Sequence, residues 1–342
     1  MDLRLLNLFG ILRKMAAAIR HSACLVLAVS AFLAVAGRAY GNVSLFVEEP
    51  YGLFGSINPT GHSAIYLNRV CAQSPTMLRR CQPGETGVVI SRYSRIRKFD
   101  WIAIPLIPYL YAVDRAEDVP EWADKAAVDK LRKQYAEAHL TSLVSMSEGF
   151  DTKNVWPQLL GVAYIRKIYS FEVVTTDEQD DFLISEYNDG TNRSHFNLFT
   201  NNCADFSRRV LNFYYPHAVG RSITADLGIT TPKQIAKALA HYASRHDGLE
   251  LNEIIIPQIP GDVPRSHTPR GVVESLLKTK KYMVPIGVLN PYVLAGIAVT
   301  YITNGRFELA KHGAVVPVWE QEQVLAGVGD DEPTTALETS QP

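Results

Sequence analysis

The stretch Phe199-Thr200-Asn201-Asn202-Cys203-Ala204-Asp205-Phe206 decides how this chain is interpreted. Asparagine is a good helix N-cap, and the apolar residues that follow Cys203 recur at helical spacing. The pattern therefore predicts a helix that begins at Cys203. Backbone N–H groups in the first turn of a helix favour negative charge and lower the pKa of a thiol, which suits a nucleophile. The alternative is a small buried hydrophobic residue, as most free cysteines are.

The N-terminal segment determines how the other cysteines are read. Basic residues precede an apolar run over 23–36 that contains Cys24, and small residues follow it. This is the order of a secretory signal, and the run is short for a bilayer span. We therefore expect residues 1–41 to be a signal peptide or an N-terminal anchor. The rest of the chain would then be exported to the periplasm or cell envelope.

Export would place the remaining thiols in an oxidising compartment, where cysteines usually form disulfides and a free thiol needs an explanation. Cys71 and Cys81 flank a short loop-like stretch, and their close spacing predicts a local disulfide. Zinc binding by this pair is the alternative, although no second Cys or His pair lies at ligand spacing. We expect neither a metal nor a cofactor. Cys203 is then an unpaired cysteine, which suggests either chemistry or intermolecular pairing.

Composition and patterning indicate a globular protein of the α+β class. The chain has 342 residues and a formal net charge of −1, so it can bury a core and offers no basic footprint for nucleic acid. Strands and helices alternate irregularly, which is typical of α+β folds. We expect strands at 42–48, 61–67, 86–93 and 163–175, an irregular strand or substrate-lining wall at 101–112, and helices at 121–144, 176–187, 203–215 and 231–243.

The character of the chain changes after Leu251. Four prolines between 257 and 269 predict a linker or arm, followed by a short basic helix at 271–281. Residues 282–302 carry no charge and are long enough to cross a bilayer, but Pro285 and Asn290-Pro291 interrupt them. A membrane span and a buried or interfacial helical hairpin both remain open. We expect a thiol domain at 42–250, an arm and apolar helical segment at 251–326, and a disordered tail at 327–342.

A partner for Cys203 is found far upstream, in Gly61-His62-Ser63-Ala64-Ile65-Tyr66-Leu67. His62 would lie on a strand among small residues, which allow a helix N-terminus to approach closely, as a Cys–His pair requires. The structural alternative is a histidine bonded to a backbone carbonyl. His195, just before the cysteine helix, is an alternative base.

These two motifs together resemble the circularly permuted branch of the NlpC-type papain-like superfamily, which includes lecithin:retinol acyltransferase-like proteins and bacterial envelope proteins. The resemblance covers residues 42–245. It implies a permuted papain-like domain with an antiparallel sheet packed on the cysteine-bearing helix. It also implies that Cys203 is the nucleophile and His62 its base. A third polar residue usually orients the imidazole from the next strand, and here that strand offers Ser91 and Tyr93.

The resemblance implies an exported cysteine hydrolase that cleaves amide bonds of cell-wall peptides or acyl bonds of lipids through an acyl-enzyme. Asn202 would then cap the helix or help to stabilise an oxyanion. The expected partners are such a substrate and, through residues 282–302, a membrane, but not nucleic acid. Two alternatives use the same fold without chemistry: a non-catalytic envelope binding protein, and a membrane-tethered scaffold that works through its C-terminal region.

Overall fold

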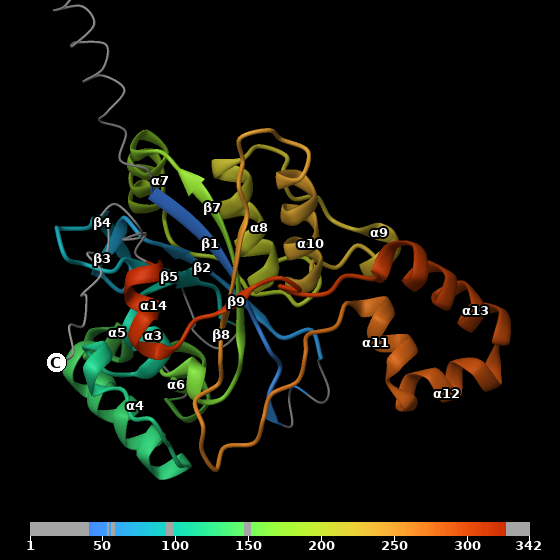
Figure 1. The fold of residues 1–342 in the computed structure, drawn as a ribbon, viewed down its shortest axis with the longest axis horizontal. Helices are drawn as coiled ribbons and strands as arrows, with labels where there is room; N and C mark the ends of the chain where they lie inside the picture. The colour runs from blue at the N-terminus through green and yellow to red at the C-terminus, as the bar shows by residue number, and fades with distance from the viewer. Residues whose placement is uncertain (1–40, 53–54, 56–58, 94–98, 147–151, 326–342) are drawn as a thin grey trace, which may run out of the picture. The chain divides into compact units, whose positions relative to one another are not determined.

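A mixed sheet forms the centre of the protein, with the strand order β6-β5-β2-β1-β7-β8-β9 (Figure 1). Neighbouring strands are antiparallel except β8 and β9, which are parallel. The strands are β1 Gly41–Glu48, β2 His62–Leu67, β5 Val88–Ser91, β6 Ile102–Pro105, β7 Ile168–Thr175, β8 Asn252–Ile256 and β9 Ala314–Val315. A separate hairpin pairs β3 Val70–Ser74 with β4 Met77–Arg80.

The computed structural model describes residues 41–52, 55, 59–93, 99–146 and 152–325. The signal or anchor predicted for 1–41, except for Gly41, and the tail predicted for 327–342 lie outside the described residues. The sheet and the helices that surround it confirm the predicted α+β class. They are α3 Leu106–Tyr111, α4 Lys125–His139, α5 Thr141–Met146, α6 Thr152–Leu159, α7 Asp177–Asp189, α8 Cys203–Tyr214, α9 Ile223–Asp226, α10 Pro232–Ala243, α11 Val272–Lys278, α12 Lys280–Leu289, α13 Pro291–Thr300 and α14 Val318–Leu325, with short turns η1 Ala116–Asp118, η2 Val162–Tyr164 and η3 Tyr301–Gly305.

The sheet separates two hydrophobic cores, because successive side chains of a strand point to opposite faces. In β2, Ile65 and Leu67 join one core together with the apolar faces of α8 and α10. Ala64 and Tyr66 join the other core, which contains α3 and the buried residues of α4. Helix α8 therefore lies on the Ile65 face of the sheet (Figure 1).

Three expected elements differ in the structure. The stretch between Cys71 and Cys81 is a β-hairpin rather than a loop. Residues 101–112 form β6 and then helix α3, because Pro105 precedes the helix and Pro108 lies in its first turn, where a missing N–H is tolerated. The helix expected over 121–144 is divided at Leu140 into α4 and α5.

The sheet also extends beyond residue 250, where we expected the thiol domain to end. Strand β8 pairs with β7 along its whole length, from Ile168 opposite Ile256 to Glu172 opposite Asn252. Its buried residues, Ile254 and Ile256, belong to the core that contains α3. Residues 252–256 are thus part of the central sheet, and the arm begins after them.

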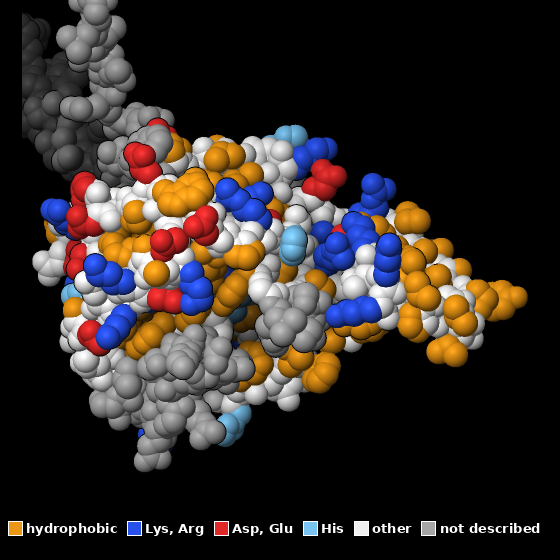
Figure 2. Space-filling view, turned by 90° about the horizontal axis from the view of Figure 1, so that it is seen from below, with side chains coloured by type: hydrophobic (Ala, Val, Ile, Leu, Met, Phe, Trp, Pro, Cys, Tyr) orange, Lys and Arg blue, Asp and Glu red, His pale blue; other side chains and the backbone are white. Residues whose placement is uncertain are grey.

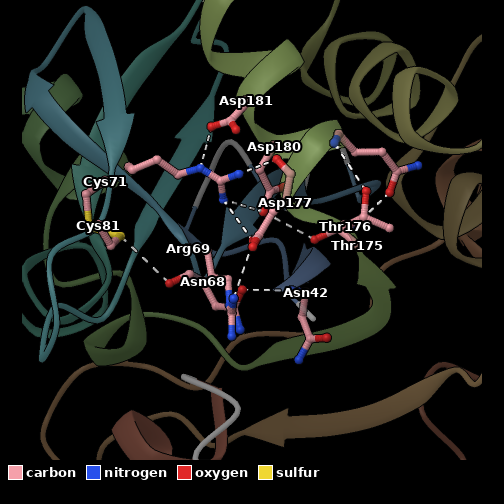
Figure 3. Close-up of polar contacts among 12 residues, drawn as sticks. Asn42, Asn68, Arg69, Cys71, Cys81, Thr175, Thr176, Asp177, Asp180 and Asp181 are labelled. Atoms are coloured by element: carbon pink, nitrogen blue, oxygen red, sulfur yellow. Dashed lines mark hydrogen bonds and ion pairs between the residues drawn. A yellow bond between two sulfur atoms is a disulfide. The ribbon is translucent and has the colours of Figure 1, made fainter. Parts of the chain in front are cut away.

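The predicted disulfide between Cys71 and Cys81 is present and closes the β3–β4 hairpin. Figure 3 shows the hairpin joined to the start of α7 by ion pairs. Arg80 lies 2.6 Å from Asp181 and 3.3 Å from Asp180, and Arg69 lies 3.3 Å from Asp177. These ion pairs hold the β3–β4 hairpin against α7, although the two elements are about a hundred residues apart in the sequence.

The uncharged run 282–302 forms two short helices, α12 and α13, that turn at Asn290. Together with η3 they contact α9 and α11 (Figure 1). Among the described residues, no helix combines the length and the apolar character that a bilayer crossing requires.

Candidate thiol site

Cys203 is the first residue of α8, as the sequence predicts. Asn202 caps the helix by accepting a hydrogen bond from the Asp205 N–H at 2.9 Å, and the Asn202 N–H donates in return to the Asp205 carboxylate at 3.3 Å. The Asn202 amide also donates to the carbonyl oxygens of Leu198 and Thr230. Asn202 therefore acts as the N-cap, and its amide hydrogens are both engaged away from an oxyanion position.

The thiol of Cys203 lies beside β2, at the residue that follows His62. The backbone N–H and the hydroxyl of Ser63 lie close enough to the sulfur to act, as hydrogen-bond donors, toward a lower pKa of the thiol. Ser207, one helical turn further along α8, donates from its hydroxyl to the Ser63 hydroxyl at 3.0 Å. Two positions of α8 are thus held against one serine of β2, which fixes the start of the helix on the strand.

Burial changes the expected acidity of this thiol. The pKa of Cys203 is raised above its usual value, chiefly because the sulfur is desolvated. The Ser63 donors and the Ala204 N–H at the helix start act in the opposite direction but do not outweigh the burial. The expectation of a lowered pKa is therefore wrong for the unliganded site, because a helix terminus is a weaker influence than loss of water.

His62 is the first residue of β2, and its imidazole binds Ser91 on the neighbouring strand β5. His62 Nε2 lies 2.8 Å from Ser91 Oγ, and Ser91 Oγ in turn donates to the Ser63 carbonyl oxygen at 2.9 Å. Because the single hydroxyl hydrogen of Ser91 goes to that carbonyl, Ser91 accepts from His62. We assign the proton of the neutral imidazole to Nε2, which leaves Nδ1 with a free lone pair.

Gly61 allows the backbone to reach this position. It has φ +77°, and a side chain on it would meet the Glu48 carbonyl oxygen at 2.2 Å. Tyr93 completes the surroundings of His62 by stacking on the imidazole, with ring centroids 5.1 Å apart. The ring orientation is therefore determined by one hydrogen bond and one aromatic contact.

A buried ion pair lies behind the histidine. Glu48 is the cross-strand partner of His62 on β1, and its carboxylate is 2.7 Å from Arg166 and bonded to the Tyr109 hydroxyl. Desolvation, followed by the Arg166 charge, lowers the pKa of His62 to about 3. The imidazole is therefore neutral over the ordinary pH range.

The structure thus brings His62 together with Ser91, and Cys203 together with Ser63. His62 and Ser63 are consecutive on β2, so their side chains leave opposite faces of the strand. The imidazole therefore lies on the Ala64 and Tyr66 face, whereas α8 packs on the Ser63 and Ile65 face, and no contact described for either residue joins the sulfur to the imidazole.

The lower-ranked candidates have other surroundings. His195 is exposed, and its carbonyl oxygen accepts from Asn201. Asp205, the carboxylate in the first turn of α8, is buried and binds Arg221 and Thr230, each at 2.6 Å, which is a structural role. The one metal-like cluster among the described residues combines Glu85 with Cys71 and Cys81, whose sulfurs are bonded to each other.

Sequence reasoning missed two charged groups near the site. Arg92, which follows Ser91, is almost fully buried and carries its guanidinium over the Phe206 ring of α8. It pairs with Asp100 and binds Asn201, just before the cysteine helix. Glu48 with Arg166 is the other group. Lone charged residues at the ends of apolar strands are the signal that could have revealed both.

Large cavities occur elsewhere in the protein. One of about 1610 Å³ lies near the Cys81 hairpin and Pro257, and another of about 1170 Å³ lies along α4. The described residues that line them include neither Cys203 nor His62. Neither of these two cavities therefore contains the thiol site.

Comparison with known proteins leaves the family open. No family model and no curated protein matches the chain. Among solved structures, the crystal structure of a type VI secretion system effector, TseH, is similar at 13% sequence identity. The match covers 62% of this chain and 97% of that one, with a TM-score of 0.27. A likeness of this size supports no argument about fold or function.

Proposed function

We propose that this protein is a cysteine hydrolase with Cys203 as nucleophile, His62 as base and Ser91 as the residue that orients the base. The observation that carries the proposal is the chain of hydrogen bonds from His62 Nε2 to Ser91 and from Ser91 to Ser63. These hydrogen bonds orient the imidazole so that its unprotonated Nδ1 points away from Ser91. Ser63, the next residue on β2, lies against the sulfur of Cys203. A nucleophile, a base and an orienting group are the parts that thiol catalysis requires.

The acidities of the two groups determine how the reaction would proceed. In the resting site the pKa of the Cys203 thiol is raised and the pKa of the His62 imidazole is lowered, so both groups are neutral. Because the two groups lie on opposite faces of β2, the proposal requires the proton to pass from Cys203 Sγ to His62 Nδ1 around the end of the strand as the sulfur attacks a carbonyl carbon. The Cys203 backbone N–H stabilises the oxyanion. The imidazolium, a strong acid, then returns the proton to the leaving group, and water hydrolyses the thioester.

The substrate class rests on the motif resemblance: amide bonds of cell-wall peptides or acyl bonds of lipids. An exported location, in the periplasm or cell envelope, is part of the same proposal. The Cys71–Cys81 disulfide supports it, because such bonds persist in oxidising compartments.

A second function has a specific observation in its favour. The raised pKa of Cys203 and the lowered pKa of His62 are also what an inert, buried thiol beside a structural histidine would show. A non-catalytic envelope protein that uses the fold for binding is the competing proposal.

An acylation experiment separates the two. The folded protein is incubated with p-nitrophenyl acetate, and acetyl transfer to Cys203 is measured by release of nitrophenol and by mass spectrometry. We expect His62→Ala to slow acetylation at pH 7.5 at least about 100-fold, the usual contribution of a general base. Ser91→Ala should slow it less, while the exposed His195→Ala serves as matched control.

The catalytic proposal fails if acetylation of Cys203 proceeds equally in wild type and His62→Ala. It also fails if the folded protein resists acetylation and reacts only in urea. Either result would favour the binding protein.

A further inference from the structure

The two helices α12 and α13, here called the C-terminal hairpin (residues 280–300), expose an unusual amount of apolar side chain. Around the turn Val288, Leu289 and Tyr292 are 79%, 84% and 87% exposed. Val284, Val293 and Val299 are each at least half exposed. Figure 2 shows hydrophobic side chains gathered over this part of the chain. Exposing a contiguous apolar patch to water is unfavourable, so a patch of this kind marks a site of interaction with a membrane or another protein.

Positive charge surrounds the base of the hairpin. Lys280 and Lys281 are exposed at its start, and Arg306 is exposed just after η3. Between residues 265 and 307 the one acidic residue is Glu274, which is buried and paired with Lys233 at 2.8 Å and Lys278 at 2.7 Å. Figure 2 shows Lys and Arg side chains between the apolar patch and the rest of the surface. The base therefore carries excess positive charge.

The turn of the hairpin is suited to an apolar medium. Asn290 ends α12 by donating its N–H to the Ile286 carbonyl oxygen, and its side chain caps α13 by accepting from the Val293 N–H. Pro291, the first residue of α13, has no N–H to satisfy. Backbone groups that would lose water on insertion are thus partly paired within the turn, which a hydrocarbon environment demands.

The length of the hairpin fits half a bilayer. Each helix has ten residues, and at a rise of about 1.5 Å per residue this is about 15 Å. The hydrocarbon core of a bilayer is about 30 Å thick. A hairpin of this size reaches the middle of the bilayer and returns, so both of its ends remain on one side.

We propose that the C-terminal hairpin is a monotopic membrane anchor that inserts into one leaflet of a bilayer containing anionic lipid. The apolar turn enters the acyl chains, and the basic residues at the base contact the headgroups. A second copy of the chain is a less suitable occupant, because pairing two identical patches would bring two sets of like charges together. The proposal does not depend on chemistry at Cys203.

Flotation of the full chain with vesicles tests the anchor. We expect binding to phosphatidylcholine vesicles that contain phosphatidylglycerol, and weaker binding to phosphatidylcholine alone. Val288→Asp with Leu289→Asp should lower the partition coefficient at least about tenfold, because charge is costly in the bilayer interior. Lys280→Glu with Lys281→Glu should abolish the preference for anionic vesicles. Phe182→Asp, at an exposed apolar residue on α7, is the matched control.

A second measurement reports on the hairpin itself, because the apolar run at 23–36 could bind vesicles independently. A nitroxide is attached at Leu289→Cys in a background that carries Cys24→Ser and Cys203→Ser, with Phe182→Cys in the same background as control. Electron paramagnetic resonance should show the label at 289 becoming accessible to oxygen and shielded from a water-soluble nickel complex when vesicles are added. A label that stays in water overturns the proposal, as does a hairpin that mediates dimerisation without binding vesicles.

Discussion

At the scale of single residues, this site depends on the competition between burial and local charge. A helix N-terminus and two serine donors favour the Cys203 thiolate, yet desolvation raises the pKa of the thiol. His62 is affected in the complementary direction, because burial and Arg166 both disfavour the imidazolium. Both groups are therefore neutral at rest, so the proposed catalysis would require substrate binding to activate the thiol.

The low pKa of His62 predicts a loss of stability in acid. The unfolded histidine has a pKa of about 6.5 and the folded one about 3, so between these values the unfolded state binds more protons. The contribution of His62 is complete above pH 6.5 and falls as the pH drops toward 3, by at most about 1.4 kcal/mol per pH unit.

Urea unfolding at several pH values from 4 to 7 measures this effect. We expect the unfolding free energy of His62→Asn to fall less steeply with acid than that of the wild type. His195→Asn is the control at an exposed histidine. Parallel curves for His62→Asn and wild type would show that His62 does not titrate between the two states.

At the scale of elements, the cap of α8 links the fold to the site. Asn202 closes the capping box and also ties the helix start to two loop carbonyls, at Leu198 and Thr230. The same side chain thus determines where the helix begins and how Cys203 is presented to β2. This is the reason the sequence pattern around Cys203 was informative.

Asn202→Ala should lower the unfolding free energy by about 1–2 kcal/mol, because N-cap loss costs about that much. It should also slow acetylation of Cys203. Thr176→Ala removes the equivalent capping box of α7 and should lower stability alone. Thermal unfolding and the acetylation assay measure the two effects. Equal acetylation rates in the Asn202→Ala and Thr176→Ala variants would show that the Asn202 cap has no influence on the reactivity of Cys203.

At the scale of the whole molecule, the Glu48–Arg166 pair joins β1 to the segment before β7 inside the core that contains α3. Both residues are almost fully buried, at 0% and 3% exposure. Removing one partner leaves an uncompensated charge, whereas removing both does not.

Arg166→Met should therefore lower the unfolding free energy by about 3–5 kcal/mol at pH 7. Adding Glu48→Gln should recover part of this loss, although each change alone is destabilising. A double-mutant cycle by urea unfolding measures the coupling. A double variant that is no more stable than Arg166→Met would mean that the pair does not act as a unit.

Much of the element order was predictable because its causes are local. The N-cap before Cys203 and the alternating pattern of β2 depend on neighbouring residues only, as do the caps of α7 at Thr176 and of α10 at Thr231. The α3 helix after Pro105 was mistaken for an irregular strand, because short apolar segments have no distinctive period. The β8 strand was missed because its stability comes from pairing with β7, not from its own five residues.

The candidate site residues were named from the sequence, Cys203 and His62 from motifs and Ser91 from its place on the next strand. The structure places Ser91 within hydrogen-bond distance of His62, and the catalytic roles of all three stay a prediction. The acidities could not be predicted, because they depend on Arg166 and on burial. No local pattern brings Arg166, more than a hundred residues away, behind His62.

The sequence by itself determined where β1, β2, α7, α8 and α10 begin, that Cys71 pairs with Cys81, and that Cys203 remains free. Only the tertiary structure decided that this thiol is protonated at rest and that β8 belongs to the sheet. It also decided that the uncharged run 282–302 turns back at Asn290 with its apolar side chains exposed. Capping and periodicity act over a few residues, whereas desolvation, long-range charge and sheet pairing act between residues that only folding brings together.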